Sequence, residues 1–432
     1  MPQRLIRNLF DQYDQPENRL THALVQVLAS DAALARAFVR FTTGHPPPTG
    51  SSLGLSCQLL PGEAAQQVAE EEYASKRGLP DAWIFDETTG WALVCECKIT
   101  SGLKVQQLRG HAREAQKRGF HTIGVLAITA DESEPSAVSS IRDEVAASWV
   151  SWPAVFEFFT KYSERLLASE LTGYIRVLEG KLMSQGYEGP PLTKFTGVPF
   201  GPNHPYTEAE AKVVLRALMT DLRPRLGRSR VLPPIDPDFR RPALTGAWDI
   251  IGFDFASRDD FTRHPHMSVY IDPEECGVGL VLPNNARPEY WRRMRACTQE
   301  RLTAVLSDVW QRLKSISYHI HRSVQEPQLI LDVRQRHFYT RRKSVVDGHL
   351  RFDLSPLLAQ PQAAGQGVKA VPAWLDAAMA VVAATPHANF QLELQVSFPV
   401  MDGSICRKPG FAESLANAAE ALHPFLALLR GQ

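Results

Sequence analysis

The chain lacks the features that mark secreted and membrane proteins. No apolar run approaches the roughly 20 residues needed to cross a bilayer, and residues 1–5 do not begin an apolar signal segment. Its six cysteines show no paired spacing, which argues against a disulfide framework; they stand at positions 57, 95, 97, 276, 297 and 406. We therefore expect a cytoplasmic protein with reduced thiols, neither secreted nor membrane-spanning.

A net charge is also absent, because 47 lysines and arginines balance 47 aspartates and glutamates. A partner of strong charge, such as nucleic acid, would then need a local basic surface rather than the charge of the whole chain. The length of 432 residues and the apolar content of 44% are enough for two or three domains with sizeable cores.

A short hairpin pattern carries the clearest chemical signal. Residues 83–86 read as a strand, 87–90 as a polar turn ending in glycine, and 91–95 as the returning strand. The hairpin brings Asp81, before the first strand, back beside Glu96, after the second. Side chains alternate along a strand, so Glu96 and Lys98 share one face.

These three side chains fit metal-dependent phosphodiester hydrolysis. Two carboxylates can hold a hard cation such as Mg2+, and a neighbouring lysine can orient a water or offset transition-state charge. An acid and a lysine at the tip of an apolar strand are costly unless they bind something. The alternative is a surface hairpin with an incidental ion pair.

The flanking segments predict further elements around the hairpin. Residues 16–28 form an apolar helical stripe with Glu17 in the first turn, near the positive end of the helix dipole. A helix is expected over 104–118, and an apolar strand over 122–129. An earlier strand falls at either 55–60 or 67–73. The order is then helix, three strands, helix, strand.

Over residues 14–160 this pattern resembles the PD-(D/E)xK nuclease superfamily, with its restriction-endonuclease-like fold. Asp81, Glu96 and Lys98 match the proline-aspartate and acid-x-lysine positions of the family. The resemblance implies a mixed sheet flanked by helices, Mg2+ as the cofactor with Mn2+ able to substitute, and phosphodiester hydrolysis.

The resemblance also implies roles for residues around the triad. Glu17 matches the first-helix acid that many members add to the metal site, and the backbone carbonyl of Cys97 matches another metal ligand. Gln107 matches a glutamine that reaches back toward the site, although a helix glutamine can simply face solvent. His111 stands where an aromatic residue is frequent; we assign it no role and expect it on the helix surface or at the rim of the site.

Composition divides the chain into three parts. The nuclease-like domain is expected over residues 1–184, and a proline- and glycine-rich connector over 185–206. Residues 207–432 predict an α+β domain on a mostly antiparallel sheet. Strands are expected at 248–255, 266–271, 277–282, 328–333 and 390–400, and helices at 207–222, 288–313, 374–384 and 412–429. No motif in this second domain indicates a particular chemical activity.

Local basic surfaces are available for nucleic acid. Lys104 and Arg109 lie on the helix after the active-site strand. A second set interleaves with aromatic residues on which bases could stack; it comprises Arg334, Arg336, Arg341 and Arg342. The alternative for that set is a solvated strand pair with charged edges.

The site residues and the resemblance together favour a metal-dependent endonuclease, with DNA favoured over RNA as its substrate, and the resemblance implies a bacterial defence or restriction system as its setting. We expect a homo-oligomer or a subunit of a multi-protein defence complex, because cutting a duplex usually requires two sites. Two alternatives stay open: a repair or mobile-element nuclease, and an assembly or binding protein whose nuclease-like core is structural.

Overall fold

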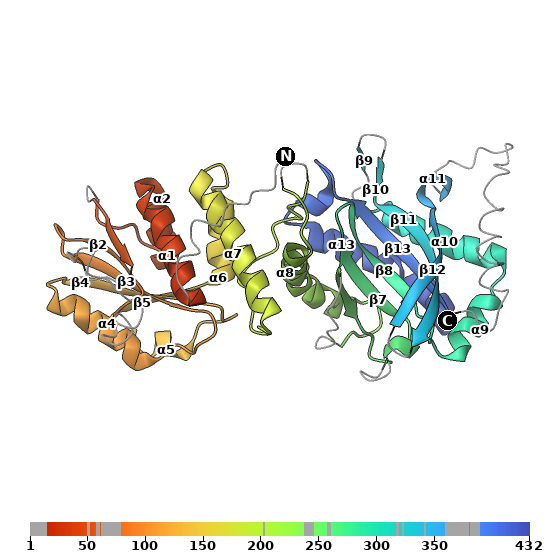
Figure 1. The fold of residues 1–432 in the computed structure, drawn as a ribbon, viewed down its shortest axis with the longest axis horizontal. Coiled ribbons are helices and arrows are strands. Elements are labelled where there is room, and N and C mark those ends of the chain that lie inside the picture. Colours follow the sequence, from red (N-terminus) through yellow and green to blue (C-terminus); the bar gives the residue numbers. More distant parts are fainter. Residues whose placement is uncertain are drawn as a thin grey trace. The chain divides into compact units, whose positions relative to one another are not determined.

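The computed structural model describes residues 15–49, 52–57, 61, 79–201, 204–236, 246–256, 261–316, 319–321, 324–340, 343–358, 380 and 389–432. The chain divides into two compact units, Met1–Lys194 and Phe195–Gln432 (Figure 1). The boundary falls within the segment 185–206, and each unit is described by itself.

The first unit is built on a five-stranded mixed sheet in the order β1-β2-β3-β4-β5. Strands β1 to β3 pair antiparallel, whereas β3, β4 and β5 run parallel. The β2–β3 turn is closed by Asp86, whose carboxylate accepts hydrogen bonds from Thr88 N and Thr89 Oγ1. The strands are β1 Gly54–Cys57, β2 Ala82–Asp86, β3 Trp91–Lys98, β4 Thr122–Thr129 and β5 Ala146–Ser151.

Helices pack on both faces of this sheet, each over its own apolar cluster. One face is covered by α1 Pro16–Ala29, α2 Ala32–Thr43, α6 Trp152–Thr160 and α7 Leu166–Ser184; the other by α4 Val105–Lys117 and the short α5 Ser136–Ser139 (Figure 1). Helix α2, which we did not predict, begins where Asp31 accepts a hydrogen bond from Leu34 N. The candidate strand at 67–73 lies outside the described residues, whereas β1 overlaps the candidate at 55–60.

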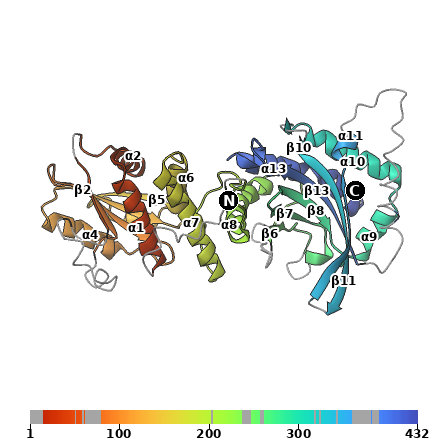
Figure 2. The same ribbon diagram turned by 45° about the horizontal axis from the view of Figure 1, so that its top comes forward.

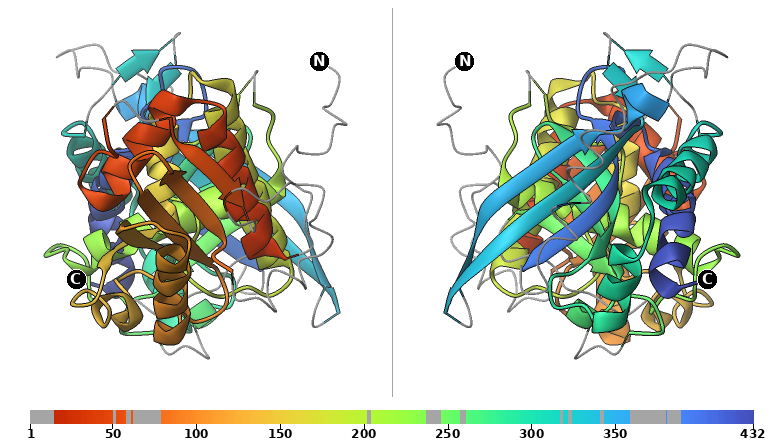
Figure 3. Two further views of the ribbon diagram at one scale, coloured as in Figure 1. Left: turned by 90° about the vertical axis from the view of Figure 1, so that its left-hand side faces the viewer. Right: turned by 90° about the vertical axis from the view of Figure 1, so that its right-hand side faces the viewer.

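The second unit contains a six-stranded sheet in the order β12-β11-β13-β8-β7-β6. Every neighbouring pair is antiparallel, as predicted. Strands β11 and β12 form a long hairpin, whose outer part pairs with no other strand among the described residues (Figures 2 and 3). The strands are β6 Ala247–Ile251, β7 His266–Ile271, β8 Glu275–Leu282, β11 Gln328–Thr340, β12 Lys343–Asp353 and β13 Phe390–Pro399; β9 His319–His321 and β10 Val324–Glu326 form a separate pair.

One apolar core joins this sheet to helices on one of its faces. The helices are α8 Glu208–Gly227, α9 Pro288–Arg295, α10 Gln299–Leu313, α13 Phe411–Ala421 and α14 His423–Arg430, with the short α11 Ser355–Leu358 and the 3-10 turns Phe261–Arg263 and Ile405–Arg407. Along β7, Met267, Val269 and Ile271 belong to this core. Side chains alternate along a strand, so the residues between them face the other way.

Two single helices expected from the sequence are each a pair of helices. The segment 288–313 breaks before Thr298, whose side chain accepts from Arg301 N and starts α10 anew. The segment 412–429 breaks at Leu422, two residues before Pro424. A proline prefers the first turn of a helix, so it marks a start rather than an interior position. The expected helix at 374–384 lies outside the described residues except for residue 380.

The proline-rich segment between the units is irregular but packed. Phe195, Val198 and Phe200 belong to the core of the second unit, and Leu192 belongs to that of the first. Among the described residues, no helix combines the length and the apolarity that a membrane span requires.

Candidate active site

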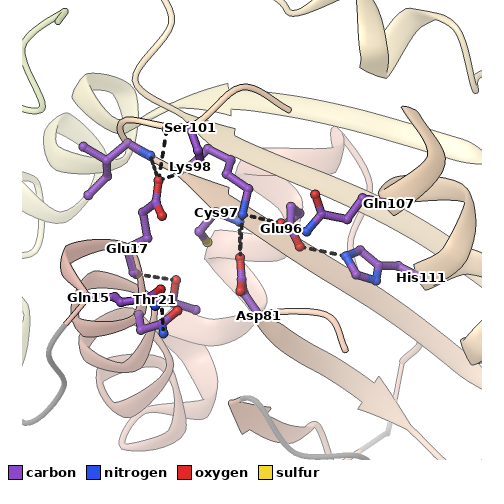
Figure 4. A network of polar contacts seen from close by, with 12 residues as sticks. Gln15, Glu17, Thr21, Asp81, Glu96, Cys97, Lys98, Ser101, Gln107 and His111 are labelled. Atoms are coloured by element: carbon purple, nitrogen blue, oxygen red, sulfur yellow. Dashed lines mark hydrogen bonds and ion pairs between the residues drawn. The ribbon is translucent and has the colours of Figure 1, made fainter. Parts of the chain in front are cut away.

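The β2–β3 hairpin brings the two predicted carboxylates together. Ala82 pairs with Cys95 across the hairpin, so Asp81 lies opposite Glu96. The Cys97 N–H donates a hydrogen bond of 2.8 Å to Asp81 Oδ2, which fixes this carboxylate against the next strand (Figure 4). The Cys97 side chain is buried in the core on the opposite face, as the alternation predicts.

Lys98 completes the cluster from the same face as Glu96. Its Nζ lies 2.5 Å from Glu96 Oε1 and 4.0 Å from Asp81 Oδ2. Burial works to lower the pKa of Lys98, but the charges of Glu96 and Asp81 outweigh it, so this pKa is raised. The lysine therefore carries its positive charge between two carboxylates.

The pKa of Asp81 shows that the charges of this cluster are not fully balanced. Burial, and after it the negative charge of Glu96, raises the pKa of Asp81 to about 7, although Lys98 and the Cys97 N–H both act to lower it. One ammonium group thus leaves the pair of carboxylates incompletely neutralised. A site of this kind favours additional positive charge.

Helix α4 supplies two further contacts to Glu96. Gln107 Nε2 donates to Glu96 Oε1, so this glutamine reaches back toward the site. His111 Nε2 lies 2.7 Å from Glu96 Oε2 (Figure 4). Our expectation that His111 lies on the helix surface or at the rim is wrong, because this side chain is fully buried. Its spacing of four residues from Gln107, which places both on one helix face, was the signal available in the sequence.

Glu17 acts on the loop after β3. Its Oε1 accepts hydrogen bonds from the backbone N–H groups of Ile99, Thr100 and Ser101 and from the Ser101 hydroxyl, at 3.0 to 3.3 Å. Burial acts to raise the pKa of Glu17, but the amides of Ile99 and Thr100 and the charge of Lys98 outweigh it, so the pKa is lowered. The first-helix acid thus ties α1 to the end of the active-site strand.

A cavity of about 380 Å³ adjoins Lys98 within the first unit. Its walls come from the loop 99–102, the end of β4 with residues 130–131, and the segment around Tyr187. The end of β3 is held from behind, since Trp152 Nε1 donates a hydrogen bond of 3.2 Å to the Lys98 carbonyl. The lysine therefore has a fixed backbone and an open space beside it.

The site offers two carboxylates, rather than a complete set of protein ligands, to a divalent cation. No group of three or more histidine, cysteine, aspartate or glutamate side chains in the described ranges is arranged to hold a metal ion. Asp81 and Glu96 nevertheless offer carboxylate oxygens on one face, and their charges exceed that of Lys98. Mg2+ is typically bound by one or two carboxylates, with waters and substrate phosphate completing its shell, so this pair fits that ion.

The candidate nucleic-acid residues are dispersed. Lys104 precedes the first turn of α4, and Arg109 is engaged in an ion pair with Glu144. Arg334 forms an ion pair with Asp332, with 2.7 Å between Nε and Oδ1. Arg336 lies on β11, but its side chain is outside the described part of the structure, as are Arg341 and Arg342 entirely.

Comparisons with known proteins assign no family to this chain. Neither the protein-family models, nor the curated proteins, nor the solved structures contain a match to this chain.

Proposed function

We propose that the protein is a Mg2+-dependent nuclease that hydrolyses phosphodiester bonds. The observation that supports this most strongly is the gathering of Asp81, Glu96 and Lys98 at the end of one hairpin, beside a cavity. Asp81 and Glu96 would hold the ion, together with the Cys97 carbonyl. When bound, the ion supplies Lewis-acid stabilisation of charge on the phosphate.

The remaining roles belong to the chain's own groups. Lys98, which stays protonated beside two carboxylates, would bind a phosphate oxygen and offset the charge that develops in the transition state. Gln107 and His111 hold Glu96 in place, and Glu17 holds the loop that borders Lys98.

The burial of two neighbouring carboxylates weighs against a purely structural core. Two carboxylates held together in a mostly buried setting reduce stability unless they bind a ligand. The raised pKa of Asp81 reflects this loss of stability. An assembly protein with no use for the site would gain stability by replacing Asp81 or Glu96 with neutral residues.

Substrate and setting extend the proposal. We favour DNA over RNA and a bacterial defence or restriction role, in line with the resemblance of residues 14–160 to the PD-(D/E)xK superfamily. One such cluster cuts one strand, so cleavage of a duplex would involve a second copy of the chain or a partner subunit.

The test is a cleavage assay on the full-length protein. Supercoiled plasmid, linear duplex, single-stranded DNA and RNA are incubated with Mg2+, with Mn2+ or with EDTA. The matched variants are Asp81→Asn and Asp143→Asn; Asp143 is an exposed acid of the same unit. We expect cleavage that requires the metal and is lost only in Asp81→Asn. Cleavage that persists in EDTA, or equal activity of the two variants, would refute the proposal.

A further inference from the structure

The face of the second sheet opposite the described helices of its core is polar across several strands. Its pairing register aligns Arg351, Asp332 and Glu393 across β12, β11 and β13. The neighbouring row aligns Gln395, Gly279 and Ser268 across β13, β8 and β7. An exposed sheet face normally carries solvated polar groups, yet Asp332, Glu393 and Gln395 are all at most 4% exposed.

Two glycines of β8 leave room on this face for neighbouring groups. A Cβ on Gly279 would lie 2.1 Å from Glu393 Oε1, and one on Gly277 would lie 2.3 Å from the Val396 carbonyl. The Glu393 side chain therefore lies across the space that any larger residue at 279 would fill. A cavity of about 520 Å³ opens on the same face, and Glu393, Gln395 and Trp248 are among the residues that line it. This volume lies within the range of sites that bind small molecules.

Acidic groups outnumber basic groups around this cavity. Its walls include Asp272, Glu275 and Glu393 against Arg334 and Arg351. Each arginine already has a carboxylate partner: Arg351 donates to Glu275 at 2.5 and 2.6 Å, and Arg334 pairs with Asp332, as described above.

Glu393 differs in its surroundings from Asp272 and Glu275, the other two acids in the cavity wall. The Asp272 carboxylate accepts from the N–H groups of Glu274 and Glu275, which closes the turn before β8. Burial, with the negative charge of Asp332 adding to it, raises the pKa of Glu393 to about 7, although Arg334, Arg351 and the amide of Gln395 act to lower it. A buried acid of this kind gains from a positively charged ligand.

The side chain of Gln395 also favours a ligand that carries N–H donors. Gln395 Oε1 is buried and has no hydrogen-bond partner among the described residues. A buried acceptor without a donor is destabilising, so a ligand N–H would recover this loss. Trp248, 39% exposed, lines the same cavity, and an indole ring attracts cations to its face.

We propose that this cavity binds a small organic cation, whose ammonium or guanidinium group is held by Glu393 and Gln395 while its apolar part packs against Trp248. The site lies wholly within the second unit and does not depend on the nuclease chemistry proposed for the first. The Gln395 Oε1 acceptor and the surplus of acidic over basic groups select against anionic ligands.

Agmatine, which carries both an ammonium and a guanidinium group, is a suitable probe. Titration calorimetry and thermal unfolding of the full-length protein measure its binding, with AMP as the anionic comparison. We expect saturable binding of agmatine with a raised melting temperature, and no such effect of AMP. Absence of agmatine binding at millimolar concentrations, or preferential binding of AMP, would overturn the assignment.

Two variants locate the site. Glu393→Gln should weaken agmatine binding by at least about tenfold, and Gly279→Ala should weaken it by displacing the Glu393 side chain. Glu326→Gln is the matched control, because Glu326 is another buried acid of the same unit and bonds to Ser404 instead. Equal affinities of Glu393→Gln and Glu326→Gln would contradict the proposal.

Discussion

His111 Nε2 lies 2.7 Å from Glu96 Oε2, and both side chains are fully buried. The hydrogen bond joins α4 to the end of β3, so the orientation of Glu96 is set by two elements rather than by its strand alone. Gln107 contacts the other oxygen of the same carboxylate. Glu96 is therefore held at both oxygens from one helix.

This relationship predicts a positioning role for His111. His111→Phe should lower the cleavage rate by about 10–100-fold, the usual effect of losing a group that orients a metal-binding residue. His111→Gln, which restores an N–H donor, should recover part of the rate. Single-turnover kinetics measure the chemical step, and KM for DNA should change little. Equal rates in both variants and the wild type would remove the role.

The carboxylates themselves should be essential for cleavage but not for folding. Asp81→Asn and Glu96→Gln should each lower activity by several orders of magnitude, because both would hold the ion. Asp81→Asn should leave the melting temperature unchanged or raise it, since it removes one of two like charges. Plasmid cleavage and thermal unfolding measure the two effects. A variant that loses activity only by unfolding would not support the assignment.

Lys98 should affect both catalysis and the stability of the metal-free protein. Lys98→Ala should abolish turnover while DNA binding persists. In EDTA it should lower the free energy of unfolding by about 3 kcal/mol, because two carboxylates lose their cation. Mg2+ should then stabilise Lys98→Ala more than it stabilises the wild type. Urea unfolding with and without Mg2+ measures this difference, and equal Mg2+ effects on both proteins would count against the idea.

Glu17 can be tested as a loop anchor against its expected role as a metal ligand. Glu17→Ala removes the acceptor for three backbone N–H groups and should cost about 1–3 kcal/mol of stability. Glu17→Gln keeps an oxygen acceptor and should retain most of the stability and activity. Calorimetric titration with Mn2+ distinguishes the two roles, because a loss of metal affinity as large in Glu17→Gln as in Glu17→Ala would identify a ligand.

The stability of the second unit should depend on the protonation of Glu393. Its pKa is raised from 4.5 to about 7 by burial, against the opposing influence of Arg334 and Arg351 and with Asp332 adding negative charge. Between these values the folded chain holds a proton that the unfolded chain has released. The free energy of unfolding therefore falls as pH rises from about 4.5 to about 7, by about 3 kcal/mol, and then levels off.

Glu393→Gln should remove this part of the pH dependence. Urea unfolding from pH 4.5 to 8, followed by hydrogen exchange of backbone amides of the second unit, compares the variant with the wild type. The control is Glu326→Gln, which should keep the fall in stability. An unchanged pH profile in Glu393→Gln would show that other groups cause it.

The local elements of the first unit could be predicted because their patterns are strong. The strand 122–129 and the helix 16–28 carry apolar periods that packing reinforces, and β4 and α1 agree with them within one residue. The proximity of Asp81 and Glu96 followed from one short hairpin. Contacts between distant segments could not be predicted in this way: Glu17 meets Ser101 only after the sheet and α1 have packed together.

In the second unit, sequence patterns could not show which residues gather on one face. The row Arg351, Asp332 and Glu393 depends on the pairing of β11 with both β12 and β13, which lie far apart in sequence. Composition likewise gave no sign that Arg334 is neutralised by Asp332. The break at Thr298 was readable, since threonine is a common cap, but the apolar period on both sides concealed it.

The buried Cys97 thiol can report how often the active-site strand opens. This thiol lies between Glu96 and Lys98 in sequence, is fully buried, and has a pKa raised well above its ordinary value, chiefly by burial. Alkylating reagents attack the thiolate, so they can reach Cys97 only when β3 separates from its neighbours. The rate at which Cys97 is alkylated therefore reads out how often the active-site strand opens. Ligands that bind Asp81 and Glu96 should slow that reaction even in variants that cannot cut.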